Sequence, residues 1–302
     1  MLPPDTSGSE DRPWTSNERL IAGGFLVVFF GLLVAEIVGD WTPTRLAVPV
    51  FILSWGVLTA IHELGHALVA HALGWRVDQL RVGFGPLLRR LEWRGVAIEV
   101  RAFPIVGMVG VTPGGVAWAR TKNAAIYAAG PGIELLLAAL VASVAGWDTV
   151  LSPSDSLAVV SVQAFCVAAV TGAALNLIPF SPQPGVITDG LGIALSPFLP
   201  RAHFEAQMIR PTLAEGARLL DAGDPRAALA LLEGAADAYP DVLLLQSLIA
   251  RTLADLGRTE EALLRLRAST RSGDARRRRE AEAALEELRA YLRQRRGEAP
   301  TR

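Results

Sequence analysis

Four long apolar stretches stand out in the hydropathy pattern, at residues 20–38, 46–74, 124–145 and 157–178. A helix that crosses a bilayer needs about 20 consecutive apolar residues, so each stretch predicts a membrane span. The alternative is that some of them are buried helices of a soluble protein, which would have to hold four such runs. The first stretch is long for a signal peptide and lacks a clear cleavage site, so we expect a retained anchor.

Between the second and third spans the pattern changes to an alternation of apolar and polar residues. It covers residues 77–112, with turns marked by Gly83, Gly85–Pro86 and Arg94–Gly95. Alternation with a period of two is typical of β-strands, so the segment predicts a small β-sheet. Residues 179–200, after the fourth span, are rich in Pro and Gly and predict a loop.

The tail, residues 209–296, is polar and helical in pattern and contains an internal repeat. A shift of 34 residues superposes Leu219 on Leu253 and Gly223 on Gly257. This period, with a glycine at the tight turn between two helices, resembles the tetratricopeptide repeat. A last charged helix, 275–296, would cover the final apolar face of the stack. The alternative is a generic helical bundle.

The positions of the basic residues predict the orientation in the membrane. Among the segments between the predicted spans, residues 75–123 hold eight basic residues, whereas the loop after the first span has only Arg45 and residues 146–156 have none. The positive-inside rule then places the N-terminal segment 1–19, the 75–123 segment and the tail in the cytoplasm. The predicted fold class is a mainly α multi-pass protein of the cell membrane. It has about four transmembrane helices within a membrane domain at 20–200, a small cytoplasmic β-sheet between the second and third, and a soluble α-helical repeat domain.

Composition narrows the classes of partner. The 302 residues are 51% hydrophobic and 20% charged, the net charge is −1, and Cys166 is the only cysteine. A near-neutral chain gives no reason to expect a nucleic-acid partner. A single cysteine excludes a disulfide scaffold.

The chemistry is concentrated in the sequence His62-Glu63-Leu64-Gly65-His66, an H-E-x-x-H motif at the end of the second span. Residues four apart share one face of a helix, so both imidazoles can bind one metal ion. Glu63 lies beside them and can accept a proton from an activated water. Ionisable groups in hydrocarbon are costly unless they bind or pair, which favours a functional role. The alternative is a helix end whose polar residues reach the interface.

A catalytic zinc site needs three protein ligands, and Asp189 is the candidate for the third. It follows an Asn-x-x-Pro break, Asn176 to Pro179, at the end of the fourth span. An Asp-Gly pair alone would indicate only a turn. Together with the H-E-x-x-H motif it suggests a carboxylate brought to the membrane face.

These motifs, in this order, resemble the site-2 protease family of intramembrane zinc metalloproteases, over about residues 40–195. The matching segments are His62–His66, Gly83–Pro86, Phe103–Gly107, Gly130–Glu134 and Asn176–Gly190. The resemblance implies hydrolysis of a peptide bond in or near the membrane span of a membrane protein, in regulated intramembrane proteolysis. It also implies a lipid bilayer around the protein and a protein partner for the tetratricopeptide-like domain.

The resemblance further implies roles for particular residues. One zinc ion per chain would be held by His62, His66 and Asp189, with Glu63 as the general base. Asn176 and Pro179 would line the active-site cleft and help to hold an unwound substrate.

Two features depart from the family pattern. Glu134 stands where Asn is common after Gly-Pro-x-x, which leaves its role open. The gap of 13 residues from Asn176 to Asp189 is longer than in many members.

Two other functions remain as alternatives. One is a catalytically inactive zinc-binding membrane scaffold that acts through the repeat domain; the intact Glu63 argues against it. The other is a transporter that uses Glu36, Glu134 and Asp189; the four predicted spans and the lack of a visible inverted repeat argue against that.

Overall fold

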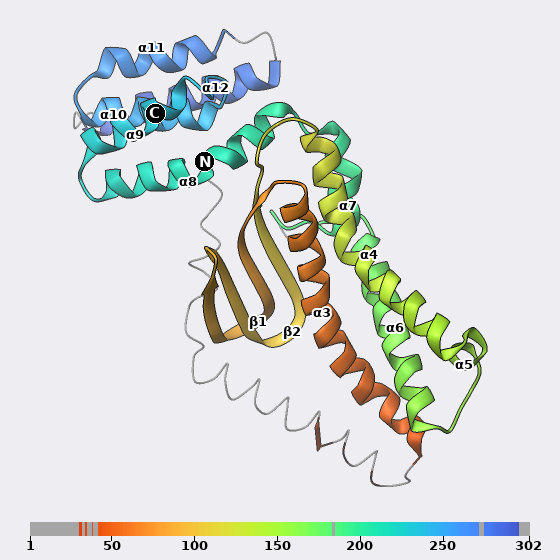
Figure 1. Cartoon of the computed structure of the whole chain (residues 1–302). Helices are drawn as coiled ribbons and strands as arrows, with labels where there is room; N and C mark the ends of the chain where they lie inside the picture. The colour runs from red at the N-terminus through yellow and green to blue at the C-terminus, as the bar shows by residue number, and fades with distance from the viewer. Residues whose placement is uncertain are drawn as a thin grey trace. The chain divides into compact units, whose positions relative to one another are not determined.

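The structure is a computed structural model, and its elements fall into two compact units (Figure 1). One unit contains the residues up to Thr112 together with Trp118–Leu199, and the other contains Pro113–Ala117 together with the residues from Pro200 onward. The residues that the structure describes are Phe30, Gly31, Val34, Val38, 42–182, 185–271 and 275–295.

The predicted N-terminal segment 1–19 lies outside the described residues. So does the predicted first span, 20–38, apart from Phe30, Gly31, Val34 and Val38, which are helical and largely exposed. The prediction of four spans is therefore tested only for the last three.

Among the described residues, three helical segments are long and apolar enough to cross a membrane. They are α3 (Ala47–Ala72), which continues from the short 3-10 helix η1 (Pro43–Leu46), α4 (Ala119–Ala145) and α6 (Leu157–Leu177). A short helix, α5 (Trp147–Leu151), connects α4 to α6. These three segments correspond to the second, third and fourth predicted spans.

Small residues allow the three long helices to approach closely. Leu58 of α3, Ala138 of α4, and Ala168 and Ala169 of α6 form a buried apolar cluster. At Gly65, an added Cβ would lie 2.9 Å from the carbonyl oxygen of Ala129, so the absence of a side chain lets α3 touch the backbone of α4. Close backbone approach at small residues is the usual way in which helices associate in lipid.

The alternating segment forms two long antiparallel strands, β1 (Arg76–Trp93) and β2 (Val96–Thr112), between α3 and α4 in the chain. Register shifts bend both strands, and residues 79–82 pair with 107–110 on one side and with 97–100 on the other. In the pairing of 79–82 with 97–100, the residue numbers of both partners increase in the same direction, as they do in parallel strands. The alternating segment thus forms two long bent strands, and their tight turn uses positive φ at Arg94 and Gly95.

A buried ionic cluster holds the bent strands together. Glu99 is 2% exposed and accepts hydrogen bonds from Arg81 (3.2 Å), Arg90 (2.7 Å) and Arg101 (3.0 Å). Burial alone would favour the neutral acid, but the hydrogen bond from Arg101 and the charges of the three arginines keep the pKa of Glu99 below its ordinary value. Arg101 also donates to the carbonyl of Gly85, at the bend in β1.

The prediction of a loop over residues 179–200 is wrong in its second half. The structure has a helix, α7 (Asp189–Leu195), and a 3-10 turn, η2 (Ser196–Phe198). The Thr188 side chain caps α7 by accepting a hydrogen bond from the backbone N–H of Leu191. A short capped helix is hard to recognise where Pro and Gly dominate, because its stability comes from the cap and from packing.

The second unit is helical: α8 (Arg201–Asp221), α9 (Pro225–Ala236), α10 (Leu243–Asp255), α11 (Thr259–Ser269) and α12 (Ala275–Arg295). Gly223 and Gly257, the two glycines of the predicted repeat, have positive φ in the turns that follow α8 and α10. Large apolar side chains form the core, among them Ile209, Leu232, Leu245, Ile249, Leu253, Leu266 and Leu285.

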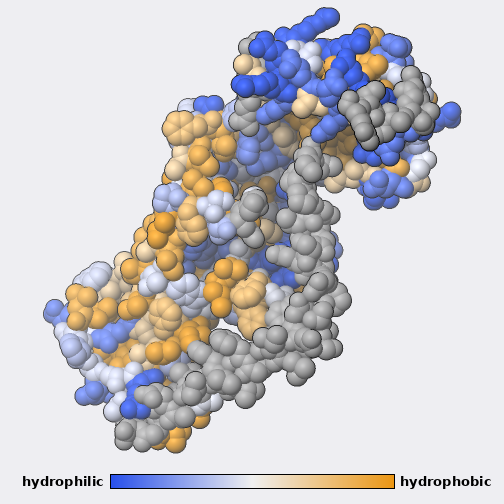
Figure 2. Space-filling model, turned by 180° about the vertical axis from the view of Figure 1, so that it is seen from behind, coloured by the Kyte–Doolittle hydropathy of each residue, from blue (hydrophilic) through white to orange (hydrophobic). Residues whose placement is uncertain are grey.

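The two units also differ on their surfaces. Exposed large apolar residues are frequent on α3, α4 and α6, whereas in the second unit Leu231 and Leu264 are the large apolar side chains exposed among the described residues. Figure 2 shows the corresponding contrast between apolar and polar residues on one face of each unit. The apolar surface fits a membrane location for the first unit.

Candidate metal centre and active site

Helix α3 places His62 and His66 one turn apart on one face. Both are buried, at 5% and 7% exposure, and their ring centroids lie 4.7 Å apart in an edge-on arrangement. This is the geometry that the spacing of the H-E-x-x-H motif predicts.

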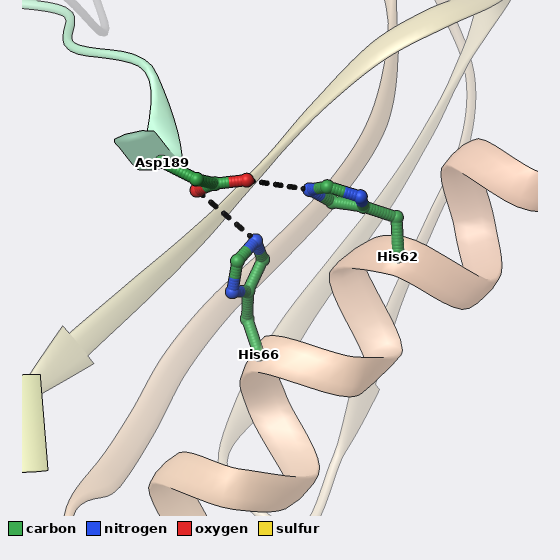
Figure 3. A group of neighbouring side chains, drawn as sticks. All are labelled: His62, His66 and Asp189. Carbon is green, nitrogen blue, oxygen red and sulfur yellow. Dashed lines mark hydrogen bonds and ion pairs between the residues drawn. The ribbon is translucent and has the colours of Figure 1, made fainter. Parts of the chain in front are cut away.

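Asp189, at the start of α7, points between the two imidazoles (Figure 3). Its Oδ2 lies 3.0 Å from Nε2 of His62, and its Oδ1 lies 3.4 Å from Nε2 of His66. One donor atom from each of the three residues lies within 4.8 Å of the others, so the three could hold a metal ion. Burial opposes the charge of Asp189, but the two histidines keep the pKa of its carboxyl below the ordinary value.

Thr188 explains how Asp189 reaches the site despite the long gap after Asn176. The Thr188 hydroxyl donates to the carbonyl of Ile178 (2.7 Å), and its backbone N–H donates to the carbonyl of Phe180 (3.1 Å). These bonds close the intervening loop at its base. At Gly190, an added Cβ would lie only 1.9 Å from the carbonyl oxygen of Leu177, so glycine lets α7 begin directly against the end of α6.

Gly130 of α4 faces the two histidines, and its lack of a side chain leaves room for both imidazoles. An added Cβ there would lie 2.4 Å from Nε2 of His62 and 2.4 Å from Nε2 of His66. The two Nε2 atoms and Asp189 thus converge beside the glycine backbone. Two imidazoles and a carboxylate are a common ligand set for catalytic zinc, so these residues fit that ion.

Glu63 lies next to the histidines in α3 and is 6% exposed. Its side chain packs against Gly107 of β2, where an added Cβ would lie 2.4 Å from Cγ and 2.5 Å from Oε1 of Glu63. The sheet is held beside this part of α3 by a hydrogen bond of 3.1 Å from Nε1 of Trp55 to the carbonyl of Ile105. The space for Glu63 therefore depends on how β2 packs against α3.

Each histidine has a second partner on α4. Nδ1 of His66 lies 2.6 Å from the carbonyl oxygen of Ile126, and Nδ1 of His62 lies 3.1 Å from Oε2 of Glu134. Glu134, whose role the sequence leaves open, is 3% exposed. Helix α4, which contributes Gly130, thus also contacts Nδ1 of both rings.

Asn176 and Pro179 lie outside this cluster. Asn176 is half-buried, and its amide donates to the carbonyl of Gly172 at 3.2 Å; Pro179 is exposed. Their role in substrate binding stays a prediction.

The contributions of Thr188, Ile126 and Trp55 were not predictable from the sequence. In the sequence, Gly107 and Gly130 are only members of motifs. The glycine before Pro131 could have been noticed as an irregularity in a span, but only packing shows which side chains occupy the space beside it.

Comparison with known proteins gives two findings. A profile of Peptidase family M50 matches residues 50–253, which is most of the chain. Shorter matches link the chain to individual proteins. A segment of 57 residues is 47% identical to the "Probable membrane metalloprotease ARASP2, chloroplastic" of Arabidopsis thaliana and covers 18% of this chain and 13% of that protein.

Two bacterial proteins show similar matches. The chain is 44% identical over 57 residues to a "Putative zinc metalloprotease" of Chlamydia trachomatis, covering 19% of this chain and 9% of that protein. It is 40% identical over 60 residues to the "Regulator of sigma-E protease RseP" of Salmonella typhimurium, covering 20% and 13%. In each of these relatives the match spans less than a seventh of the protein.

Proposed function

The chain belongs to Peptidase family M50, and from this premise we propose that it is an intramembrane zinc metalloendopeptidase. It hydrolyses a peptide bond in or near the membrane span of a membrane protein substrate. The observation that carries the proposal is the convergence of His62, His66 and Asp189 beside Gly130, with Glu63 next to them on α3.

In this proposal His62, His66 and Asp189 hold one zinc ion per chain. Bound zinc would supply Lewis-acid activation of water and of the scissile carbonyl. The protein holds the three ligands with little freedom, because both histidines are buried in α3 and Asp189 is fixed by the cap at Thr188.

Glu63 acts as the general base. It accepts a proton from the attacking water and passes it to the leaving amine, which is the usual task of a carboxylate beside a hydrolytic metal site. Its contact with Gly107 fixes the direction of the carboxylate, and its low exposure keeps bulk water away.

The substrate segment must unwind, because the peptide groups of a membrane helix are hydrogen-bonded internally. The edge of β2 can bind an extended segment by strand addition. In the described part of the sheet, residues 107–110 have pairing partners on one side only. Ile105, Val106 and Met108 expose apolar side chains there, which suits an apolar substrate. Asn176 and Pro179 complete the cleft in this proposal.

The helical unit, residues 209–296, acts as a tetratricopeptide-like domain that binds a protein partner. Supporting features are the glycine turns at Gly223 and Gly257 and the packing of α12 residues such as Leu285 into the same core. We further propose that the protein lies in the cell membrane with both ends in the cytoplasm, as the distribution of basic residues indicates.

The test is made on the full chain, purified in detergent. Wild type is expected to contain one zinc per chain and to cleave an engineered single-span membrane protein. Asp189→Ala should lose zinc and cleavage together, whereas Glu63→Gln should keep zinc and lose cleavage.

Two results would contradict parts of this proposal. Cleavage by Glu63→Gln would exclude Glu63 as the base. Zinc binding without any cleavage by wild type, against substrates of varied span sequence, would favour the inactive scaffold.

A further inference from the structure

We infer that Glu134 is a positioning residue that orients His62 for metal binding. The inference rests on the proposed function, since it concerns the same metal site. It assigns a role to a buried carboxylate that neither binds the metal nor takes part in proton transfer in the proposed mechanism.

The two ring nitrogens of His62 face two different carboxylates. Nε2 lies 3.0 Å from Oδ2 of Asp189, on the side of the ring shown in Figure 3. Nδ1 lies 3.1 Å from Oε2 of Glu134, within ion-pair distance, and neither atom makes a hydrogen bond of regular geometry within the described part of the chain. Because Nε2 faces Asp189 and Gly130, it is the atom available to a metal. When Nε2 binds a metal, Nδ1 carries the ring proton, and a carboxylate beside Nδ1 can accept a hydrogen bond from that N–H, which fixes both the tautomer and the ring rotation.

His66 shows the same arrangement with a different acceptor. Its Nδ1 lies 2.6 Å from the carbonyl oxygen of Ile126. Ile126, Gly130 and Glu134 follow one another at intervals of about one turn on α4. One face of α4 therefore places an oxygen atom beside Nδ1 of each histidine, with Gly130 between the two positions. The group beside Nδ1 of His66 is a backbone carbonyl, whereas the group beside Nδ1 of His62 is a side-chain carboxyl.

The surroundings of Glu134 are shaped for its side chain. The side chain is 4% exposed. On α6, an added Cβ at Gly172 would lie 3.0 Å from Oε1 of Glu134, so glycine makes the room that the carboxylate occupies. A carboxylate inside a membrane helix is costly unless it has a partner, and the contact with His62 supplies one.

The experiment measures zinc affinity on the full chain in detergent, by competition with a chromogenic chelator. The variants are Glu134→Gln, which keeps the shape and an acceptor oxygen, and Glu134→Ala, which removes both. Glu205→Gln is the matched control, since Glu205 is also buried but lies in α8. The melting temperature of each metal-free protein and the visible absorption spectrum of each cobalt(II)-loaded protein are recorded alongside.

Loss of an outer hydrogen-bond partner typically weakens metal binding about 10- to 100-fold, and we expect that loss in Glu134→Ala. Glu134→Gln should lose less zinc affinity, because its amide oxygen can accept a hydrogen bond from Nδ1. Both should alter the cobalt spectrum, and the control should match wild type. A packing role alone would lower the metal-free melting temperature without changing the cobalt spectrum.

Unchanged zinc affinity in both Glu134 variants would overturn the inference and leave the proposed function intact. The inference would also be overturned if Glu134→Ala had the cobalt spectrum of wild type and its zinc affinity fell only as much as its metal-free melting temperature did. If wild type bound no zinc, the proposed function would fail, and the inference with it.

Discussion

The two units of this protein are both helical, yet they are packed by opposite means. In the first unit, α3, α4 and α6 meet largely through alanine and glycine, and the ionisable side chains of His62, Glu63, Glu134 and Asp189 are buried in the same unit. In the second unit, leucine and isoleucine fill the core. Lipid is as apolar as leucine, so large apolar side chains gain little by leaving it. In water the same side chains drive folding.

The comparison teaches why glycine matters so much in the first unit. Close approach at Gly65, Gly130 and Gly172 leaves room for backbone and polar side chains between helices. Adding one methyl group there should damage the site. In the second unit, removing methyl groups should damage the fold.

The largest effect is expected from Gly130→Ala. The new Cβ would displace both Nε2 atoms, which lie 2.4 Å from its position, and zinc affinity should fall by more than the roughly 100-fold upper range for an outer-partner loss. Zinc content after dialysis against a chelator measures this. Gly132→Ala is the control: it lies two residues further along α4, and its added Cβ would have nothing within 4 Å. If Gly130→Ala kept one zinc per chain, the metal would not bind beside Gly130.

A smaller and more selective effect is expected from Gly107→Ala. The added Cβ would push away the Glu63 side chain, whose Cγ lies 2.4 Å from it. Cleavage should drop about 10²- to 10⁴-fold, the range for losing a general base, while zinc content stays unchanged. Gly115→Ala, whose added Cβ would have no atom within 4 Å, should stay active. Loss of zinc together with activity would mean that β2 supports the ligands themselves.

The second unit should respond to the reverse change. Leu245 is fully buried in α10, and Leu245→Ala should cost about 2–5 kcal/mol of its stability through the cavity that it leaves. Thermal unfolding followed by circular dichroism measures the loss, and Leu264→Ala, at an exposed position of α11, serves as the control. Zinc content should stay at one per chain. A loss of zinc would show that the two units are energetically coupled.

The family prediction is confirmed, since the family matched is the one that the motifs resemble. The helical segments at 46–74, 124–145 and 157–178 were also predictable, because long apolar runs in a chain admit few other structures. The approach of His62 to His66 followed from helix periodicity alone.

Other features depended on contacts between distant segments. The helix at Asp189–Leu195 was predicted as loop, because its cap at Thr188 and its contact with α4 outweigh the local composition. There, Asn123 donates to Ser196 at 2.9 Å, and the Tyr127 ring packs against Gly192. Local pattern carries no information about such partners.

The sequence by itself determined the class of protein, the long apolar helices and the chemical identity of the three candidate ligands, because spacing and hydropathy are local properties. Only the tertiary structure decided that Asp189 meets the histidines across a closed loop. It alone showed that Gly130 leaves room for the two histidine rings and that Gly107 leaves room for Glu63. It also showed that Glu134 contacts His62. The physical reason is that a glycine or a buried carboxylate acquires its role from what packs against it.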